Sequence, residues 1–149
     1  MKSRFKTNVA VFLILERNIN NSKQILLQKR FNTGYMDGMW DCDASGHVEA
    51  NESAKTAVIR ESKEELGIDI CYKDIDFATM SHILSDEEYI YIYFTAKKFN
   101  GSPKIMEPQK CSDLKWFDIS NIPKNIIPDR KAAILNYLNS INYEEFYWK

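Results

Sequence analysis

Residues 52–66 carry the pattern that most constrains how this chain can fold. The segment contains neither glycine nor proline, is rich in helix-forming residues and is followed by Gly67. It predicts a helix that ends at a glycine. With about 100° per residue, Glu61, Glu64 and Glu65 fall on one face of this helix. The same face carries the small apolar residues Ala54, Ala57 and Val58, whereas the residues expected to face solvent are Lys55, Thr56, Ser62 and Lys63.

Three carboxylates that continue an apolar helix face need a compensating charge. Like charges three and four residues apart on a helix repel each other, and unpaired carboxylates near a core are costly. A divalent cation removes this cost, and oxygen ligands select Mg²⁺, Mn²⁺ or Ca²⁺. The pattern therefore predicts a metal site, while an acidic face that is only solvated stays open as the simpler explanation.

A spaced signature surrounds these glutamates. Gly46 is followed by five residues, then Glu52, then seven residues, then the run Arg60-Glu61-Ser62-Lys63-Glu64-Glu65-Leu66-Gly67-Ile68. Over residues 46–68 the chain resembles the Nudix box, and every glycine, glutamate and arginine of that signature is in place. Ser62 is the one departure, because the family prefers an aliphatic residue at this position.

The resemblance implies a fold and a chemistry. The implied fold is an α/β/α sandwich, with helices flanking a mixed β-sheet, as a single Nudix domain over residues 1–149. The implied reaction is water-dependent cleavage of a diphosphate, with Mg²⁺ or Mn²⁺ as cofactor. The implied metal ligands are the backbone carbonyl of Gly46 and the carboxylates of Glu61, Glu64 and Glu65.

The same resemblance suggests supporting roles. Arg60 would brace the loop structurally and electrostatically. Glu52 would cap or tie the helix start, where negative charge is favoured, or would be a plain surface acid. The general base would be Glu61 or Glu107. Glu107 lies in the stretch Met106-Glu107-Pro108-Gln109-Lys110-Cys111, which resembles part of some nucleotide-cleaving members, and an exposed loop acid is its alternative.

Two further segments bear on the substrate. Residues 32–38 and 46–49 resemble bacterial MutT-like members more than those acting on diadenosine polyphosphates or ADP-ribose. This implies a (deoxy)nucleoside triphosphate, oxidised or not, split to a monophosphate and pyrophosphate. The expected substrate-binding residues are Arg30 and Lys110 for phosphate, Tyr35, Trp40 and Trp116 for stacking, and Asp129 for reading the base. Their plainer alternatives are surface cations, core aromatics and, for Asp129, the N-cap of the last helix.

Other functions stay open at this point. A Nudix-fold module could bind or sense a nucleotide without turnover, and other Nudix hydrolases act on ADP-ribose, dinucleoside polyphosphates or capped RNA. An isoprenoid diphosphate isomerase also uses this fold, but the chain lacks an evident acid–base cysteine loop. Residues 41–52 also resemble an EF-hand calcium loop. However, no second such loop follows, and Gly34 and Gly38 precede it where a helix is needed.

The remaining segments fit one mixed α/β domain. Strands are expected over 8–15, 24–29, 77–84, 89–98 and 114–118, an irregular loop leading into a short strand over 31–43, and a last helix over 129–143.

Composition narrows the partners. The chain has 149 residues, 20 basic and 21 acidic side chains, and a formal net charge of -1. No basic field draws it to extended nucleic acid or an anionic membrane, so the expected partner is a small nucleotide. Three unclustered cysteines argue against a disulfide framework and favour the cytoplasm. The aromatic tail 143–148 could dock on this domain or on a second copy, which leaves a homodimer open.

Overall fold

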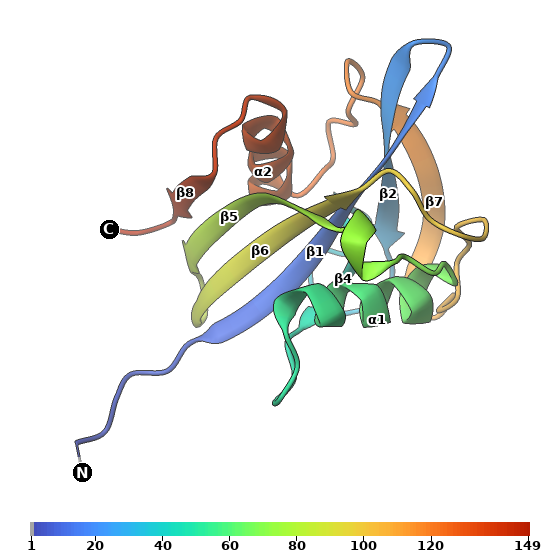
Figure 1. The fold of residues 1–149 in the computed structure, drawn as a ribbon. Helices are drawn as coiled ribbons and strands as arrows, with labels where there is room; N and C mark the ends of the chain where they lie inside the picture. Colours follow the sequence, from blue (N-terminus) through green and yellow to red (C-terminus); the bar gives the residue numbers. More distant parts are fainter. Residues whose placement is uncertain (1) are drawn as a thin grey trace.

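The computed structural model describes residues 2–149. Within them an eight-stranded sheet forms the centre, and helices α1 and α2 lie on its two faces (Figure 1). In chain order the elements are β1 (Asn8–Ile19), β2 (Ser22–Arg30), β3 (Trp40–Asp41), β4 (Asp43–His47), α1 (Ala54–Leu66), η1 (Tyr72–Asp74), β5 (Asp76–Leu84), β6 (Glu88–Ala96), β7 (Cys111–Asp118), α2 (Pro128–Leu138) and β8 (Tyr143–Phe146).

The long first strand organises the sheet. The strand order is β3-β2-β1-β6-β5-β8, with β4 paired to β1 and β7 paired to β2. β1 runs parallel to β6, and β5 runs parallel to β8, whereas the other pairs are antiparallel. The first half of β1 pairs with β4 and β6, and its last residues pair with β2. β4 is therefore fixed beside the centre of the sheet, directly before α1.

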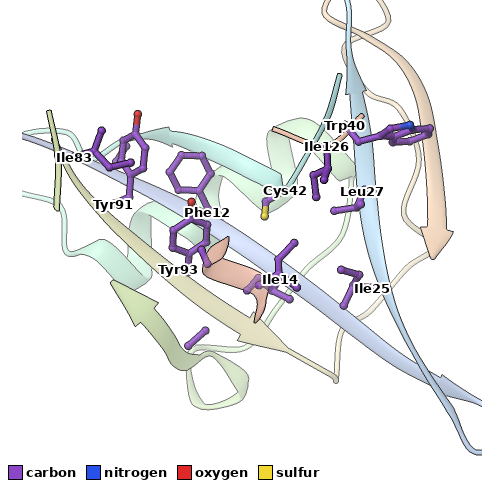
Figure 2. Close-up of a cluster of buried hydrophobic side chains, with 14 residues drawn as sticks. Phe12, Ile14, Ile25, Leu27, Trp40, Cys42, Ile83, Tyr91, Tyr93 and Ile126 are labelled. Atoms are coloured by element: carbon purple, nitrogen blue, oxygen red, sulfur yellow. The ribbon is translucent and has the colours of Figure 1, made fainter. Parts of the chain in front are cut away.

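Side chains of β1 alternate between two cores, as they must in a strand covered on both faces. One core lies under α2, and Figure 2 shows Phe12 and Ile14 of β1 in it, with Tyr91 and Tyr93 of β6. The other core lies under α1 and includes Val11, Leu13, Leu15, Ala57, Val58 and Leu66. This arrangement confirms the expected α/β/α sandwich with a mixed sheet.

Helix α1 has well-formed ends. It begins at Ala54 rather than at residue 52, because Ser53 is the N-cap and its hydroxyl oxygen accepts a hydrogen bond from the Thr56 N–H at 3.2 Å. The expected capping role of Glu52 is therefore wrong. Gly67 ends the helix with a left-handed φ of 68°, and its N–H donates to the Lys63 carbonyl at 3.1 Å, as predicted.

Ser62 does not face solvent, which corrects the expectation from the helical wheel. Its side chain is fully buried, and its hydroxyl donates to the Val58 carbonyl at 2.6 Å. A small polar residue is tolerated in this packing position because the helix backbone satisfies its hydroxyl. The departure from the Nudix signature therefore touches packing and not the carboxylates.

The C-terminal region differs from expectation. The last helix ends at Leu138, not at residue 143, and Ser140 has a left-handed φ of 58°. Residues Tyr143–Phe146 then form β8, which pairs with β5 at the edge of the sheet. The prediction of a helix over 129–143 is wrong at its C-terminal end. Tyr143 pairs with Met80 of β5, which lies some sixty residues earlier in the chain, and this strand pairing overrides the local helix propensity.

The expected strands are present, with β6 ending at Ala96 rather than at residue 98. The EF-hand alternative for residues 41–52 is wrong, because this segment begins at the end of β3 and contains β4, with no helix on its N-terminal side within residues 2–149. In the described part of the chain, no helix combines the length and apolarity needed to cross a membrane. All three cysteines are free thiols.

Candidate active site

Gly46 and Glu61 define the centre of the candidate site. Gly46 lies on β4, where it pairs with Val11 of β1, and α1 packs against this strand. A Cβ atom on Gly46 would overlap the Oε1 atom of Glu61. Only glycine therefore leaves room for the Glu61 carboxylate to lie against the backbone of β4.

Glu65 lies on the buried side of the same helix. Its Oε2 atom is buried and has no hydrogen-bond partner within residues 2–149. Burial raises the pKa of Glu65 well above its usual value, and the negative charges of Glu61 and Glu107 raise this pKa further. Burial also raises the pKa of Glu61, against the opposing hydrogen bond from Arg60. Two carboxylates are thus held together at a cost that a cation would relieve.

Glu64 lies at the rim of this pair. Its side chain is 54% exposed, and its Oε2 atom is 3.4 Å from Nη1 of Arg60. The expected inward convergence of all three glutamates therefore holds for Glu61 and Glu65, whereas Glu64 extends toward solvent. Across residues 2–149, no three acidic, histidine or cysteine side chains already form a metal cage. Glu64 must change rotamer to join the other two.

Arg60 ties the loop to the helix. Its guanidinium donates to both carboxylate oxygens of Glu52, at 2.7 and 3.0 Å, and to Glu61 at 2.8 Å. Glu52 also accepts the N–H of Glu49 at 3.0 Å. The hydrogen bond from Arg60 lowers the pKa of Glu52 to about 2. The geometry matches the bracing role expected of Arg60 and the tying role expected of Glu52.

The loop that carries Glu107 folds back over the end of α1. The Met106 N–H donates to the Glu65 carbonyl at 3.3 Å. Glu107 lies close enough for its charge to raise the pKa of both Glu61 and Glu65. The exposed Lys110 side chain has its Nζ atom 4.0 Å from the Glu107 carboxylate. The loop thus brings a carboxylate and a cation to the glutamate pair.

Two cavities adjoin the candidate site, one at Glu65 and the other at Gly46. One, of about 350 Å³, is lined by Gln28, Arg30, Asn32, Thr33, Ser45, Glu65 and Lys110. The other, of about 380 Å³, is lined mainly by aromatic and polar side chains, including Phe12, Tyr35, His47, Tyr89, Tyr91 and Arg130. Arg30 and Ser45 line both cavities. The polar space beside Glu65 therefore adjoins the aromatic space at these two residues.

The expected substrate residues fall into two groups. Arg30, Tyr35 and Lys110 line the cavities, and Arg30 donates to the Tyr35 carbonyl at 2.7 Å. Trp40 is buried in the core, edge-on to the Phe117 ring at 4.8 Å, and lines neither cavity. Its position therefore corresponds to the core alternative.

Asp129 is buried at the start of α2. It accepts a hydrogen bond from Nη1 of Arg130 at 2.7 Å, and the Tyr147 hydroxyl is 3.4 Å away. It is not the N-cap of α2, because Ile127 occupies that position. The Asp129 carboxylate therefore pairs with Arg130, which lines the aromatic cavity. The N-cap alternative for Asp129 is wrong.

Sequence reasoning missed several buried groups behind the site. Asp41 accepts hydrogen bonds from Arg30 at 3.1 Å and from Arg130 at 2.9 Å. Asp43 is fully buried, and neither of its carboxylate oxygens has a partner within residues 2–149. Burial and the charge of Glu65 raise the pKa of Asp43 well above its usual value. The local signal at Asp41 and Asp43 was the EF-hand-like pattern over residues 41–52, which indicated a different site. The alternating tyrosines of β6 were a usable signal for the aromatic wall.

The residues present fit a divalent cation. Glu65 offers a buried oxygen without a partner, and Gly46 provides the space in which Glu61 lies. The donor set consists of carboxylate oxygens and a backbone carbonyl, which suits hard cations. Glu61, Glu65 and the Gly46 carbonyl would hold the ion, with Glu64 joining from the rim.

The NUDIX domain family matches residues 5–137. The chain belongs to the Nudix family. A candidate 8-oxo-dGTP diphosphatase of Bacillus subtilis (strain 168) is 27% identical over 121 residues, which cover 81% of this chain and 75% of that protein. An isopentenyl-diphosphate Δ-isomerase 2 of Aromatoleum aromaticum (strain DSM 19018 / LMG 30748 / EbN1) is 24% identical over 112 residues, covering 72% of this chain and 58% of that protein.

The fold of this Nudix chain also matches solved structures. The MutT Nudix hydrolase of Burkholderia pseudomallei superposes with a TM-score of 0.76 at 24% identity, covering 88% of this chain and 98% of that one. The family match identifies the chain as a Nudix hydrolase, an enzyme that acts on pyrophosphate bonds, and the Burkholderia structure shows that it shares the fold of a MutT protein. Nudix hydrolases generally use divalent metals.

Proposed function

We propose that this Nudix hydrolase cleaves a (deoxy)nucleoside triphosphate, oxidised or not, to a monophosphate and pyrophosphate with Mg²⁺ or Mn²⁺. The observation that carries the proposal is that two cavities lie side by side and share lining residues. The polar cavity beside Glu65 meets the aromatic cavity at Arg30 and Ser45. Phosphates in the first space and a planar base in the second fit one nucleotide.

The chemistry is substitution at phosphorus by water. The bound cation would neutralise the phosphate chain and stabilise charge on the leaving group. Glu61, Glu65 and the Gly46 carbonyl would hold it, and Glu64 would complete the set after a change of rotamer. A new bond forms between the water oxygen and phosphorus, the anhydride oxygen leaves with the pyrophosphate, and the water proton passes to a carboxylate.

Glu107 and Glu61 are the two candidates to take that proton. Glu107 lies on the loop above the pair, and its side chain is 34% exposed, which allows contact with solvent water. Glu61 lies against Gly46 but already accepts a hydrogen bond from Arg60. Glu107 is the better base because it is free of Arg60, while Arg30 and Lys110 orient the phosphates from the cavity wall.

The experiment is a substrate panel. Purified protein is incubated with Mg²⁺ and canonical or oxidised nucleoside triphosphates, and with ADP-ribose, dinucleoside polyphosphates, capped RNA and isopentenyl diphosphate, and the products are identified by mass spectrometry. Monophosphate and pyrophosphate from a triphosphate, abolished by a chelator, support the proposal. Turnover of only another member of the panel, or binding without any turnover, contradicts it.

A further inference from the structure

The guanidinium of Arg130 forms one wall of the aromatic cavity. Its side chain is only 5% exposed, and Arg130 is one of the residues that line the cavity. Its central carbon lies 4.4 Å from the centre of the Phe12 ring and 5.1 Å from that of Tyr91. Contacts with two rings and burial fix the orientation of this planar group.

The same guanidinium has unused donors. An arginine carries five N–H groups and no acceptor. Nε donates to Asp41 at 2.9 Å, and Nη1 donates to Asp129 at 2.7 Å. The second N–H of Nη1 and both of Nη2 meet no acceptor within residues 2–149. These free N–H groups of Arg130 would be satisfied by a hydrogen-bond acceptor on a molecule bound in the aromatic cavity.

Charge balance indicates what kind of acceptor this is. The positive charge of Arg130 already faces two carboxylates, Asp41 and Asp129, and Asp41 is shared with Arg30 at 3.1 Å. Two arginines are thus matched by two aspartates, so the cavity has no excess positive charge that requires an anion. A neutral acceptor on a planar ring fits both the remaining donors and the aromatic walls.

We propose that Arg130 selects the base of the substrate, donating to the ring carbonyl and ring nitrogen of a 6-oxopurine, and this inference rests on the proposed function. Arginine pairs with the O6 and N7 acceptors of guanine, whereas adenine has an amino group in place of O6. Hypoxanthine offers the same two acceptors as guanine. Adenine nucleotides are therefore disfavoured, and so are purines whose N7 cannot accept a hydrogen bond.

The test is equilibrium binding, measured by calorimetry with nucleoside monophosphates so that no turnover is needed. GMP and IMP should each bind the unmodified protein about tenfold or more tighter than AMP, and than 7-deaza-GMP, in which N7 is replaced by carbon. Arg130→Lys, which keeps the charge but loses the planar fork, should reduce the preference for GMP over AMP to within about threefold. Arg17→Lys, which alters an arginine stacked over Trp116 at 4.3 Å, is the matched control and should leave the preference unchanged.

Several outcomes overturn the inference. Equal binding of GMP, AMP and 7-deaza-GMP by the unmodified protein does so, even if triphosphates are hydrolysed, in which case the proposed function stands alone. A preference that persists in Arg130→Lys also overturns it. If Arg130→Lys does not fold, the comparison of GMP with 7-deaza-GMP on the unmodified protein decides. A preference for GMP without hydrolysis of any triphosphate would support base selection while contradicting the proposed function.

Discussion

Arg60 and Glu52 form a two-pronged ion pair across the loop that leads into α1, with N–O distances of 2.7 and 3.0 Å. Such pairing is stronger and more directional than a single contact. It occupies Nε and Nη2 of Arg60 and leaves Nη1 for Glu61 at 2.8 Å. Glu52 therefore limits how far Arg60 can neutralise the glutamates that are needed for the metal.

This pair makes a pH prediction. Arg60 lowers the pKa of Glu52 from 4.5 to about 2, so its stabilising contribution is present above pH 4.5 and is lost as pH falls toward 2. Glu52→Gln should melt at a lower temperature than the unmodified protein at pH 6, and the difference should shrink below pH 4.5. Thermal unfolding between pH 2 and 7 measures it. Glu49→Gln, whose 3.9 Å pair with Arg60 is mostly exposed, should change little, and a gap that widens in acid would contradict the prediction.

Gly46 should not tolerate a side chain. Gly46→Ala places a Cβ where Glu61 Oε1 now lies, so the carboxylate must move and turnover should fall by about a hundredfold, as for a misplaced catalytic group. The control is Gly34→Ala, which meets no atom within 4 Å but has a φ of +84°. It should cost about 1 kcal/mol of stability through backbone strain and keep its turnover. Equal turnover in Gly46→Ala and the unmodified protein would contradict this placement.

Ser62 offers a stability test of the departure from the Nudix signature. The site is fully buried and already packed around a small side chain. Ser62→Leu should therefore destabilise the fold by about 1–3 kcal/mol through overpacking. Ser62→Ala loses the hydrogen bond to the Val58 carbonyl, which also accepts a backbone hydrogen bond within the helix. Its free energy of unfolding should therefore stay within about 1 kcal/mol of that of the unmodified protein. Urea unfolding compares the two, and a more stable leucine variant would show that the pocket has unfilled space.

The buried carboxylate of Asp41 should contribute strongly to stability, because it pairs with two arginines behind the site. Asp41→Asn removes a partner of both Arg30 and Arg130. Loss of one member of a buried ion pair typically costs about 3–5 kcal/mol. Lys63→Ala, which breaks an exposed pair with Asp69 at 3.3 Å, should cost less than about 1 kcal/mol. Denaturant unfolding separates the two cases, and similar losses in both variants would argue against a structural role for Asp41.

Site residues that are close together in the sequence could be predicted, whereas contacts between residues far apart in the sequence could not. Gly46, Glu52, Arg60 and the glutamates lie within 23 consecutive residues, 46–68, so spacing and helical periodicity were sufficient to place them. Asp41 and Arg130 lie 89 residues apart, and only the sheet and α2 bring them together. Strand β8 escaped prediction for the same reason, because its partner β5 is remote in sequence.

Trp40 illustrates a different limit. Its aromatic ring made it one of the side chains expected to stack on a base, with the core as the alternative, and β3 directs it into the core against Phe117. Glu64 is similar, since helical periodicity placed it with Glu61 and Glu65 but could not show that Arg60 holds it at the exposed rim. Periodicity gives the face of an element, whereas packing decides which side chains on that face are covered.

The most direct measurement compares Mg²⁺-dependent pyrophosphate release by the unmodified protein, Glu65→Gln and Glu144→Gln. Burial raises the pKa of Glu65, and glutamine keeps the shape of this side chain. The fold of Glu65→Gln should therefore persist, with an unchanged circular dichroism spectrum, while its turnover falls by about a hundredfold or more. Glu144→Gln alters an exposed glutamate on β8 and should retain full turnover. Undiminished pyrophosphate release by folded Glu65→Gln would contradict the assignment of this glutamate to the catalytic metal site.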